Sequence, residues 1–409
     1  METQRIAERI RQMAVSATLA MSQKSSELKA AGVDVVNLSV GEPDFDTPLH
    51  IKDAAKRAID DNFTHYSPVP GYMSLREAIA DKLRSENHAD YTPAQIVVST
   101  GAKQALSNVI MATVNAGDEV VIPVPAWVSY VEMVKLAEGE PVLIPAPMEQ
   151  GFKITPAQLA GAITPKTRMV MLCSPSNPSG AVYTRDEIAA LVEVLKQYPR
   201  IIILSDEIYE HINYTAEGHV SFGEFPEIAD RLVIVNGVSK AYAMTGWRIG
   251  FMAGPLDIAK ATTKLQGQTT SGTGSIAQKA AEAAYRGSQE CVVEMCEAFR
   301  RRRDLITALA REIPGWRLDV PQGAFYIFPD VSACLGKAAR RDMPDGTVSV
   351  TEIVTDNDLA MYLLEEAHVA TVAGSAFCLP GYLRLSYAAS DDQLREAMAR
   401  IKDAISRLV

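Results

Sequence analysis

The sequence has few cysteines and histidines, and neither kind is arranged as metal ligands usually are. Its five cysteines, in 409 residues, include no Cys-x-x-Cys pair, and its six histidines show no His-Glu-x-x-His spacing. An odd number of scattered thiols is typical of buried or neutral cysteines rather than of a disulfide framework. We therefore expect no metal site.

Long hydrophobic runs and an excess of positive charge are also missing. No uncharged apolar stretch reaches the ~18 residues that indicate a membrane span. The first residues, METQRIAERIRQMAVS, lack the apolar core of a secretory signal. The net charge of -10 argues against a general role at nucleic acids or membrane surfaces. These features predict a cytoplasmic protein that binds small molecules in a local pocket, without nucleic acid or membrane partners.

The sequence does contain an alternation of apolar, strand-like runs with helix-like segments. Ser74 and Thr184, each followed three residues later by a glutamate, predict helix starts with a capping box. Several apolar runs are continuous, as in strands covered on both faces. This alternation predicts an α/β fold with a mostly parallel sheet between helices. The expected strands are 96–99, 119–123, 168–172, 201–205, 232–236 and 248–253.

The last third of the chain has a different pattern, of short strands and charged helices. A long helix is expected at 288–312, with the run Arg300–Arg303 on its solvated face, and residues 336–350 resemble a surface insertion. Because the chain is two to three times the common domain size, we expect two domains. These are a large domain of residues 49–289 and a smaller α+β domain of residues 1–48 and 290–409. The smaller domain should also contain strands at 316–320, 324–328, 369–372 and 382–387, and helices at 355–366 and from 390.

The functional hypothesis begins with Lys240, which follows an apolar strand and precedes a turn of small residues. Arg248 lies eight positions further along the chain. Lysine forms Schiff bases because a desolvated amine loses its proton readily. The planar arginine fork can hold a phosphate of the same ligand. A lysine near an arginine is by itself more typical of a solvated surface pair, so this interpretation depends on the other motifs.

Polar and aromatic residues follow several of the other expected strands. Asp206 closes the apolar run 201–204, at the strand end where open α/β sheets bind ligands. Asn177 lies between two prolines, which in isolation would be an ordinary turn. The segment Thr100–Lys103 opens a helix, so its backbone donors can cradle a phosphate. Trp127 is placed to stack on a flat ring.

In their order and spacing, these motifs resemble those of the class I aminotransferases, in particular the bacterial aspartate aminotransferase type. These are fold-type I enzymes that depend on pyridoxal 5'-phosphate (PLP), and the resemblance covers essentially the whole chain. The matching segments are VGEPDFDTP at 40–48, HYSPVPG at 65–71, PAWVSY at 125–130, SPSNPSG at 174–180, SDEIYEH at 205–211, SKAYAMTGWRIG at 239–250 and LRLSYA at 383–388.

The resemblance implies roles for individual residues. Lys240 would carry PLP and shuttle the proton at the substrate Cα, with Asp206 and Tyr209 as the other catalytic residues. Arg384 would clamp the substrate α-carboxylate, and Tyr66 would reach the phosphate in the neighbouring subunit. The residues implied for cofactor binding are Gly101, Ala102, Trp127, Asn177, Asp206, Tyr209, Lys240, Arg248 and Tyr66. Those implied for substrate binding are Gly41, Lys103, Trp127, Asn177 and Arg384.

The implied activity is amino transfer between an L-amino acid, aspartate or glutamate first, and a 2-oxo acid. It would follow a ping-pong, Schiff-base mechanism in a homodimer with shared active sites. Two departures concern the substrate's distal carboxylate. Ala14 stands where bacterial relatives often have a lysine, and segment 265–275 contains no arginine. Lys103 is then the remaining candidate cation for that group.

Other activities stay open on the sequence alone. Within aminotransfer, the substrate could be an aromatic amino acid, alanine or prephenate. Within PLP chemistry, a fold-type I lyase begins with the same covalent linkage. From a different class, the chain could be a non-catalytic module that binds PLP or an effector.

Overall fold

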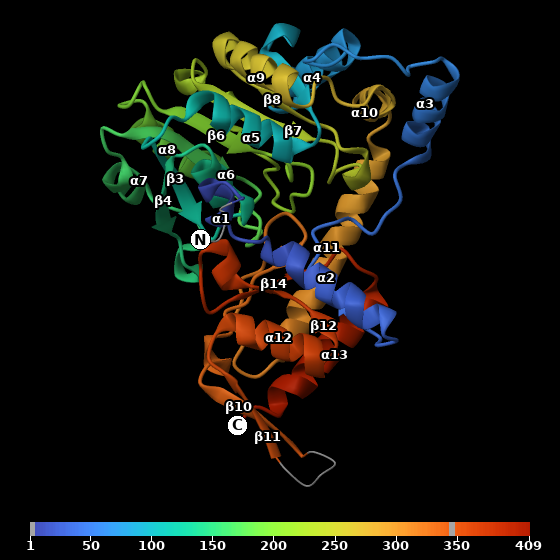
Figure 1. The fold of residues 1–409 in the computed structure, drawn as a ribbon, viewed down its shortest axis with the longest axis vertical. Coiled ribbons are helices and arrows are strands. Elements are labelled where there is room, and N and C mark those ends of the chain that lie inside the picture. Colours follow the sequence, from blue (N-terminus) through green and yellow to red (C-terminus); the bar gives the residue numbers. More distant parts are fainter. Residues whose placement is uncertain (1–4, 343–347) are drawn as a thin grey trace.

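The computed structural model describes residues 5–342 and 348–409. The chain forms an upper part around a large sheet and a lower part that holds the C-terminal helices together with an N-terminal helix (Figure 1). None of the helices in the two described ranges has the length and apolarity that crossing a membrane requires.

A seven-stranded sheet forms the upper part, with the order β2-β8-β7-β6-β5-β3-β4. Neighbouring strands run parallel except for β8, which is antiparallel to both β2 and β7. The predicted α/β fold is therefore confirmed. The strands are β2 (Ile96–Ser99), β3 (Glu119–Val124), β4 (Glu140–Pro145), β5 (Thr167–Cys173), β6 (Ile202–Asp206), β7 (Leu232–Gly237) and β8 (Gly250–Ala253).

Helices cover both faces of this sheet, and alternate strand residues enter two separate cores. Val98 and Ile203 belong to one core, whereas Val97 and Leu204 belong to the other. This is the arrangement that continuous apolar strands require. The helices of the upper part are α3 (Leu49–Asp60), α4 (Met73–Glu86), α5 (Ala102–Thr113), α6 (Ser129–Leu136), α7 (Pro156–Ala162), α8 (Arg185–Leu195), α9 (Leu256–Thr269) and α10 (Ser275–Arg286).

The structure corrects two local predictions in this part. At α8, Thr184 forms the predicted capping box with Glu187. At α4, in contrast, the helix begins at Met73 with Tyr72 as its N-cap residue, and Ser74 donates a hydrogen bond to Glu282 instead. The Ser74 prediction was wrong because a tertiary partner satisfies the hydroxyl.

The lower part joins the two ends of the sequence. Strand β1 (Val36–Asn37) pairs in parallel with β12 (Val369–Ala370). The predicted strand at 316–320 is wrong, since only an isolated bridge joins Arg317 to Asp330. The other elements of the lower part are α2 (Ala17–Ala30), α11 (Glu290–Ala310), β9 (Tyr326–Ile327), β10 (Lys337–Asp342), β11 (Val348–Ile353), α12 (Asp356–Glu366), β13 (Val372–Ala373), β14 (Leu383–Ser386) and α13 (Asp391–Ser406). The short helix α1 (Glu8–Arg11) lies instead beside α6 in the upper part (Figure 1).

Much of the segment expected as a surface insertion forms the antiparallel hairpin β10–β11, while its residues 343–347 lie outside the described ranges. The hairpin projects from the lower end of the molecule in Figure 1. The sequence predicted the insertion but not its strands, because charged residues and glycines obscure the alternation on which strand prediction depends.

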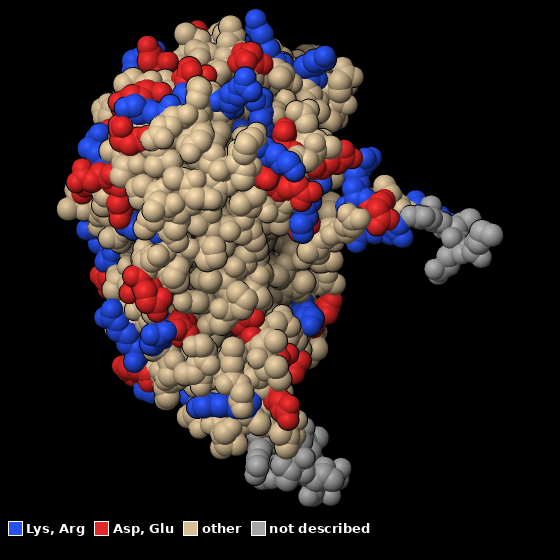
Figure 2. Space-filling view, turned by 90° about the vertical axis from the view of Figure 1, so that its left-hand side faces the viewer, with Lys and Arg blue, Asp and Glu red and all other residues tan. Residues whose placement is uncertain are grey.

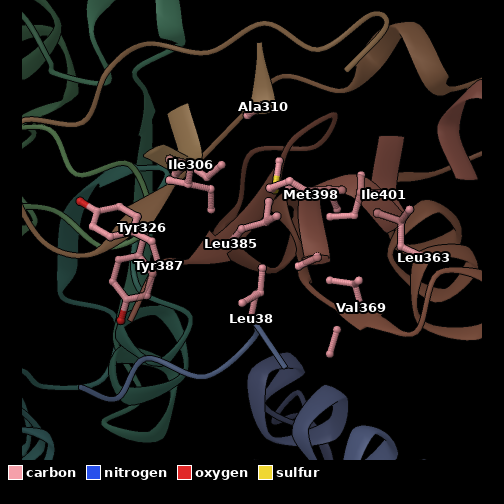
Figure 3. Close-up of a cluster of buried hydrophobic side chains, with 14 of the residues drawn as sticks. Leu38, Ile306, Ala310, Tyr326, Leu363, Val369, Leu385, Tyr387, Met398 and Ile401 are labelled. Atoms are coloured by element: carbon pink, nitrogen blue, oxygen red, sulfur yellow. The ribbon is translucent and has the colours of Figure 1, made fainter. Parts of the chain in front are cut away.

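A third hydrophobic core holds the lower part together. Leu38 from the N-terminal segment lies in the same cluster as Val369, Leu385 and Met398 (Figure 3). This core also includes Tyr209 from the upper part. The division into a large domain (49–289) and a small one (1–48 with 290–409) stays a proposal, which the separate cores support.

Candidate active site

A cavity of about 490 Å³ lies where the carboxyl ends of the central strands face the lower part of the chain. Residues from both parts line it, from Ser16 near the N-terminus to Arg384 near the C-terminus. Open α/β sheets bind their ligands at this edge. The predicted site residues among its lining are Gly41, Ala102, Lys103, Trp127, Asn177, Asp206, Tyr209, Lys240, Arg248 and Arg384.

Asp206 is the last residue of β6 and is buried at the base of the cavity. Its Oδ2 accepts a hydrogen bond of 2.6 Å from the Tyr130 hydroxyl, and its Oδ1 accepts one of 3.2 Å from the backbone N–H of Ile208. Burial raises the pKa of Asp206 to about 6, while these two donors act in the opposite direction. Sequence reasoning missed Tyr130, which lies three residues after Trp127 at the start of α6 and could equally have been a core residue.

Lys240 follows β7 and extends its side chain into the cavity. Its Nζ donates a 2.6 Å hydrogen bond to the Gly41 carbonyl oxygen and lies 5.7 Å from the centre of the Tyr209 ring. Burial lowers the pKa of Lys240 to about 8, with Arg384 and Arg248 acting in the same direction. A larger share of this amine is therefore neutral at physiological pH than for an ordinary lysine, which makes it a stronger nucleophile.

Arg248 and the N-terminus of α5 form a second corner of the site. Gly101 has a φ of +83°, and a Cβ atom there would collide with the Arg248 guanidinium. A Cβ atom at Gly250 would collide with the backbone N of Ala102. The helix start and the guanidinium therefore approach each other as closely as glycine allows. Backbone donors, a helix dipole and an arginine together suit a phosphate.

Arg384, on β14, is almost completely buried on the side of the cavity facing the lower part. Its Nη1 donates to Asn177 Oδ1 at 3.0 Å, and its Nη2 donates to the Ser39 carbonyl oxygen. Its Nε is buried without a hydrogen-bond partner among the described residues. Burial lowers the pKa of this guanidinium. A buried cation with an unused donor suits a carboxylate ligand.

Tyr326 is a second site residue that sequence reasoning missed. Its hydroxyl oxygen lies 2.8 Å from that of Tyr209, and its ring centre lies 4.6 Å from the Arg384 guanidinium. A Cβ atom at Gly41 would collide with this hydroxyl. No local motif marks Tyr326, because a buried tyrosine on a short strand has the same sequence pattern whether it lines a site or a core.

Lys103 lies in the first turn of α5 and also lines the cavity. Its Nζ is 4.8 Å from the centre of the Trp127 ring, and burial, followed by the charge of Arg248, lowers its pKa. Lys103 also lines a neighbouring groove of about 850 Å³, to which Ala14 and Thr270 contribute. The structure thus places Lys103 near both of the positions where the sequence lacks the expected distal cation.

Two predicted residues do not line the cavity. Gly101 lies directly behind Arg248, as described above. Tyr66 is fully exposed and makes no part of the cavity within its own chain. Its expected role in a neighbouring subunit's site therefore stays a prediction.

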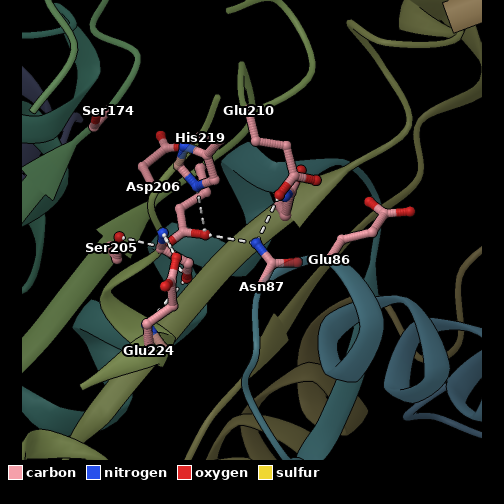
Figure 4. A network of polar contacts seen from close by, with 12 residues as sticks. Glu86, Asn87, Ser174, Ser205, Asp206, Glu210, His219 and Glu224 are labelled. Atoms are coloured by element: carbon pink, nitrogen blue, oxygen red, sulfur yellow. Dashed lines mark hydrogen bonds and ion pairs between the residues drawn. The ribbon is translucent and has the colours of Figure 1, made fainter. Parts of the chain in front are cut away.

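A buried polar network lies behind Asp206 (Figure 4). Glu207 accepts hydrogen bonds from Ser205, Ser221 and Asn87 and contacts His219 at 3.1 Å. Two groups of acidic and histidine side chains here have the geometry to hold a metal ion, and they share Glu210. One group adds Glu86 and His211, and the other adds Glu207 and His219. Lys82 already pairs with Glu210, however. Burial raises the pKa of Glu210, but Lys82, His211 and His219 together lower it further, so that it falls to about 2. The expectation of no metal site stays a prediction.

The chain matches the family model for aminotransferase class I and II over residues 33–401. It is 47% identical to an aspartate/prephenate aminotransferase from Nitrosomonas europaea, over 98% of this chain and 100% of that protein. It is 50% identical to the protein of the same description from Cereibacter sphaeroides, over 95% of each chain. The solved aspartate aminotransferase of Rhizobium meliloti has a TM-score of 0.93 and 45% identity, over the full length of both chains. That of Thermus thermophilus with maleate has a TM-score of 0.90 and 40% identity, covering 98% of this chain and 100% of that one.

Proposed function

Because the chain belongs to the class I and II aminotransferases, we propose that it moves an amino group between an L-amino acid, aspartate first, and a 2-oxo acid. As a member of this family it is a PLP-dependent transferase of the EC 2.6.1 class. The observation that carries the proposal is the convergence of a buried amine (Lys240), a buried carboxylate (Asp206) and a buried guanidinium (Arg384) on one cavity.

The residues of the cavity fit PLP group by group. PLP, when bound, supplies the electron sink that makes the substrate Cα acidic. The collisions that a Cβ atom at Gly101 or Gly250 would cause mark a cradle of the kind a phosphate needs. We assign Lys240 to the aldehyde, Asp206 to the pyridine nitrogen, Tyr209 and Asn177 to the phenolic oxygen, Trp127 to the ring face, and Arg248 with Gly101 and Ala102 to the phosphate.

The chain's own groups then have separate tasks in the reaction. Asp206 holds a negative charge in a buried place and so keeps a proton on its partner nitrogen. Lys240, with a pKa of about 8, can both accept and return the proton at the substrate Cα near neutral pH. Arg384 binds the α-carboxylate. By fixing the carboxylate, Arg384 would set which Cα bond can break, and a carboxylate kept out of the breaking position favours loss of the Cα proton over decarboxylation.

The choice of aspartate rests on the relatives, which are named for aspartate, and on Lys103 at the mouth of the cavity. The names of two relatives also include prephenate, so prephenate is a second candidate amino acceptor. A dicarboxylate and prephenate share a distal carboxylate, for which Lys103 is the available cation. Aromatic amino acids and alanine would not use this charge. The lyase and effector-module alternatives gain no support from the relatives named above.

The assembly and the compartment are also part of the proposal. We propose a homodimer with shared active sites, supported by the full exposure of Tyr66. Figure 2 shows a broad surface with few charged side chains, and charged residues are depleted in the centres of interfaces between subunits. A cytoplasmic location is supported by the five cysteines, all of which are free thiols.

A panel of amino donors tests the proposal. The purified enzyme, loaded with PLP, is assayed with aspartate, glutamate, alanine and phenylalanine, using 2-oxoglutarate, oxaloacetate and prephenate as acceptors. We expect the highest kcat/KM with aspartate and no turnover by the Lys240→Ala variant. Equal kcat/KM values for alanine and aspartate would contradict the acidic substrate. An enzyme inactive in every combination would contradict aminotransfer itself.

A further inference from the structure

Residues 40–47 form a loop between β1 and α3, which we call the Gly41 loop. Its first residues line the cavity, where the Gly41 carbonyl accepts the hydrogen bond from Lys240 and the Gly41 Cα lies against Tyr326. Its far end is bound to the upper part of the chain, because the Thr47 hydroxyl donates to the Ala243 carbonyl oxygen at 2.7 Å. Between these ends the loop passes over α11.

Asp44 is where the Gly41 loop meets α11. Its two oxygens accept hydrogen bonds of 2.6 and 2.9 Å from Nη1 and Nη2 of Arg302, in a bidentate ion pair. The guanidinium also lies 4.9 Å from the centre of the Phe45 ring, and this ring packs edge-to-face on Phe299 at 5.3 Å. One loop residue is thus held by charge and the next by ring contacts, both from the same helix.

Arg302 is buried, with 7% of its surface exposed, so the expectation that Arg300–Arg303 form a solvated face was wrong for this residue. Its neighbour Arg301 fits that expectation, since its side chain is 62% exposed and pairs weakly with Asp391 at 3.4 Å. Asp44 is more open to solvent, with 31% of its side chain exposed, and an ion pair that water reaches contributes little net stability. Stability alone therefore does not explain why an arginine and an aspartate meet here.

Resting on the proposed function, we propose that Asp44 and Arg302 are positioning residues for substrate binding. Their ion pair fixes the Gly41 loop to α11, and the loop in turn sets where the Gly41 main chain lies against the substrate space. Among the residues assigned to PLP, Lys240 donates a hydrogen bond to the Gly41 carbonyl oxygen, whereas the hydrogen bonds of Asp206, Tyr209 and Arg248 all go to residues outside the loop. The pair should therefore govern the binding of the amino acid without governing the binding of PLP.

Asp44→Asn tests this proposal, because it keeps the shape of the side chain and removes its charge. We expect KM for aspartate and the Kd of maleate, a dicarboxylate that cannot react, to rise about three- to thirtyfold. We expect kcat and the Kd of PLP to change less than about twofold, since no cofactor ligand lies on the Gly41 loop. Arg301→Gln is the matched control on the same helix and should leave all four quantities unchanged.

The double variant Asp44→Asn with Arg302→Gln separates positioning from stability. Removing both partners relieves the unpaired buried charge, so the Tm should recover partly while the Kd of maleate stays high. A recovered Tm together with a wild-type Kd of maleate in any of these variants would overturn the proposal. So would a loss of PLP affinity equal to the loss of maleate affinity. If Asp44→Asn fails to fold, Arg302→Lys, which keeps the charge but not the two-pronged contact, must show the same rise in KM.

These outcomes are distinct from a failure of the proposed function. If the wild-type enzyme transaminates none of the amino acids in the panel, the proposed function is wrong. If the wild-type enzyme is active and the Asp44 and Arg302 variants bind maleate normally, only the positioning role is wrong.

Discussion

The hydroxyl oxygen of Tyr130 lies 2.6 Å from Oδ2 of Asp206 and donates a hydrogen bond to it. Both groups are buried, so this bond helps to keep the carboxylate ionised in a place where burial favours its protonated form. Tyr130 thereby acts on the cofactor site through Asp206, and it is therefore a positioning residue.

Tyr130→Phe should weaken PLP binding about ten- to a hundredfold, because a hydrogen bond to a charged group contributes about 1.5–3 kcal/mol. The pKa of Asp206, now about 6, should rise further, so that more of the carboxyl is protonated at pH 7. The loss of affinity should therefore be larger at pH 6 than at pH 8. Fluorescence titration with PLP across this range measures it. Tyr91→Phe, which removes a buried hydrogen bond to the Leu232 carbonyl oxygen, is the control and should leave PLP affinity unchanged.

The pKa of Lys240 predicts how fast the cofactor-free protein takes up PLP. Only the neutral amine attacks an aldehyde, and burial lowers the pKa of this amine to about 8. The uptake rate should rise about fivefold from pH 7 to pH 8 and less than twofold from pH 8 to pH 9. Stopped-flow absorbance measures the uptake rate. The same measurement with free lysine in place of the protein corrects for the titration of PLP itself. A rate that keeps climbing to pH 10 would mean that the amine has an ordinary pKa, and Lys240→Ala should show no absorbance change.

Mixing two damaged variants tests whether the active sites are shared. A dimer of one Tyr66→Ala chain and one Lys240→Ala chain would contain one intact site and one doubly damaged site. Random mixing should then restore about a quarter of wild-type activity, since half of the dimers are mixed and half of their sites are intact. The control mixes Lys240→Ala with a chain that carries both substitutions, which leaves no intact site. Activity that does not rise above that of Tyr66→Ala alone would show that each site belongs to a single chain.

Lys103→Ala should change the substrate preference more than the chemistry. A buried second carboxylate without a cation is costly, so kcat/KM for aspartate, glutamate and 2-oxoglutarate should fall about a hundredfold. Alanine and phenylalanine have no such group and should react nearly as before. Lys135→Ala, which removes a lysine from the neighbouring groove, is the control. Equal losses for alanine and aspartate in Lys103→Ala would show that Lys103 serves the cofactor instead.

Strands that are covered on both faces were the easiest elements to predict. β2 is predicted residue for residue, because its four residues are all apolar or small and all buried. β4 was missed because it contains two prolines and is largely exposed at the edge of the sheet. Arg248 was placed in a strand, but its φ of 58° lies in the left-handed region, and β8 begins only at Gly250. The position of β4 at the sheet edge and the backbone conformation of Arg248 both depend on packing against distant segments. The residue pattern within one segment does not contain that information.

The residues of the candidate site likewise fall into those that a local motif predicts and those that only the fold reveals. Lys240, Asp206 and Arg384 each stand in a distinctive motif, and the structure places all three around one cavity. Tyr130 and Tyr326 reach the site only through contacts between segments that are distant in the sequence. A buried tyrosine is also common in ordinary hydrophobic cores, so its presence alone did not indicate a site. Arg302 was misjudged for the same reason, since its partner Asp44 lies 258 residues away in the sequence.

The pairing of β1 with β12 has a consequence for how the protein is made. Val36 and Val369 are neighbours in space, yet a ribosome adding about 5–20 residues per second needs roughly 20–70 seconds to travel from one to the other. Throughout that interval Leu38 and the apolar residues around it lack Val369, Leu385 and Met398, which complete their core. The nascent N-terminal segment therefore exposes apolar side chains of the kind that chaperones bind during translation. A ribosome that stalls before Val369 would release a chain whose first strand has nothing to pair with.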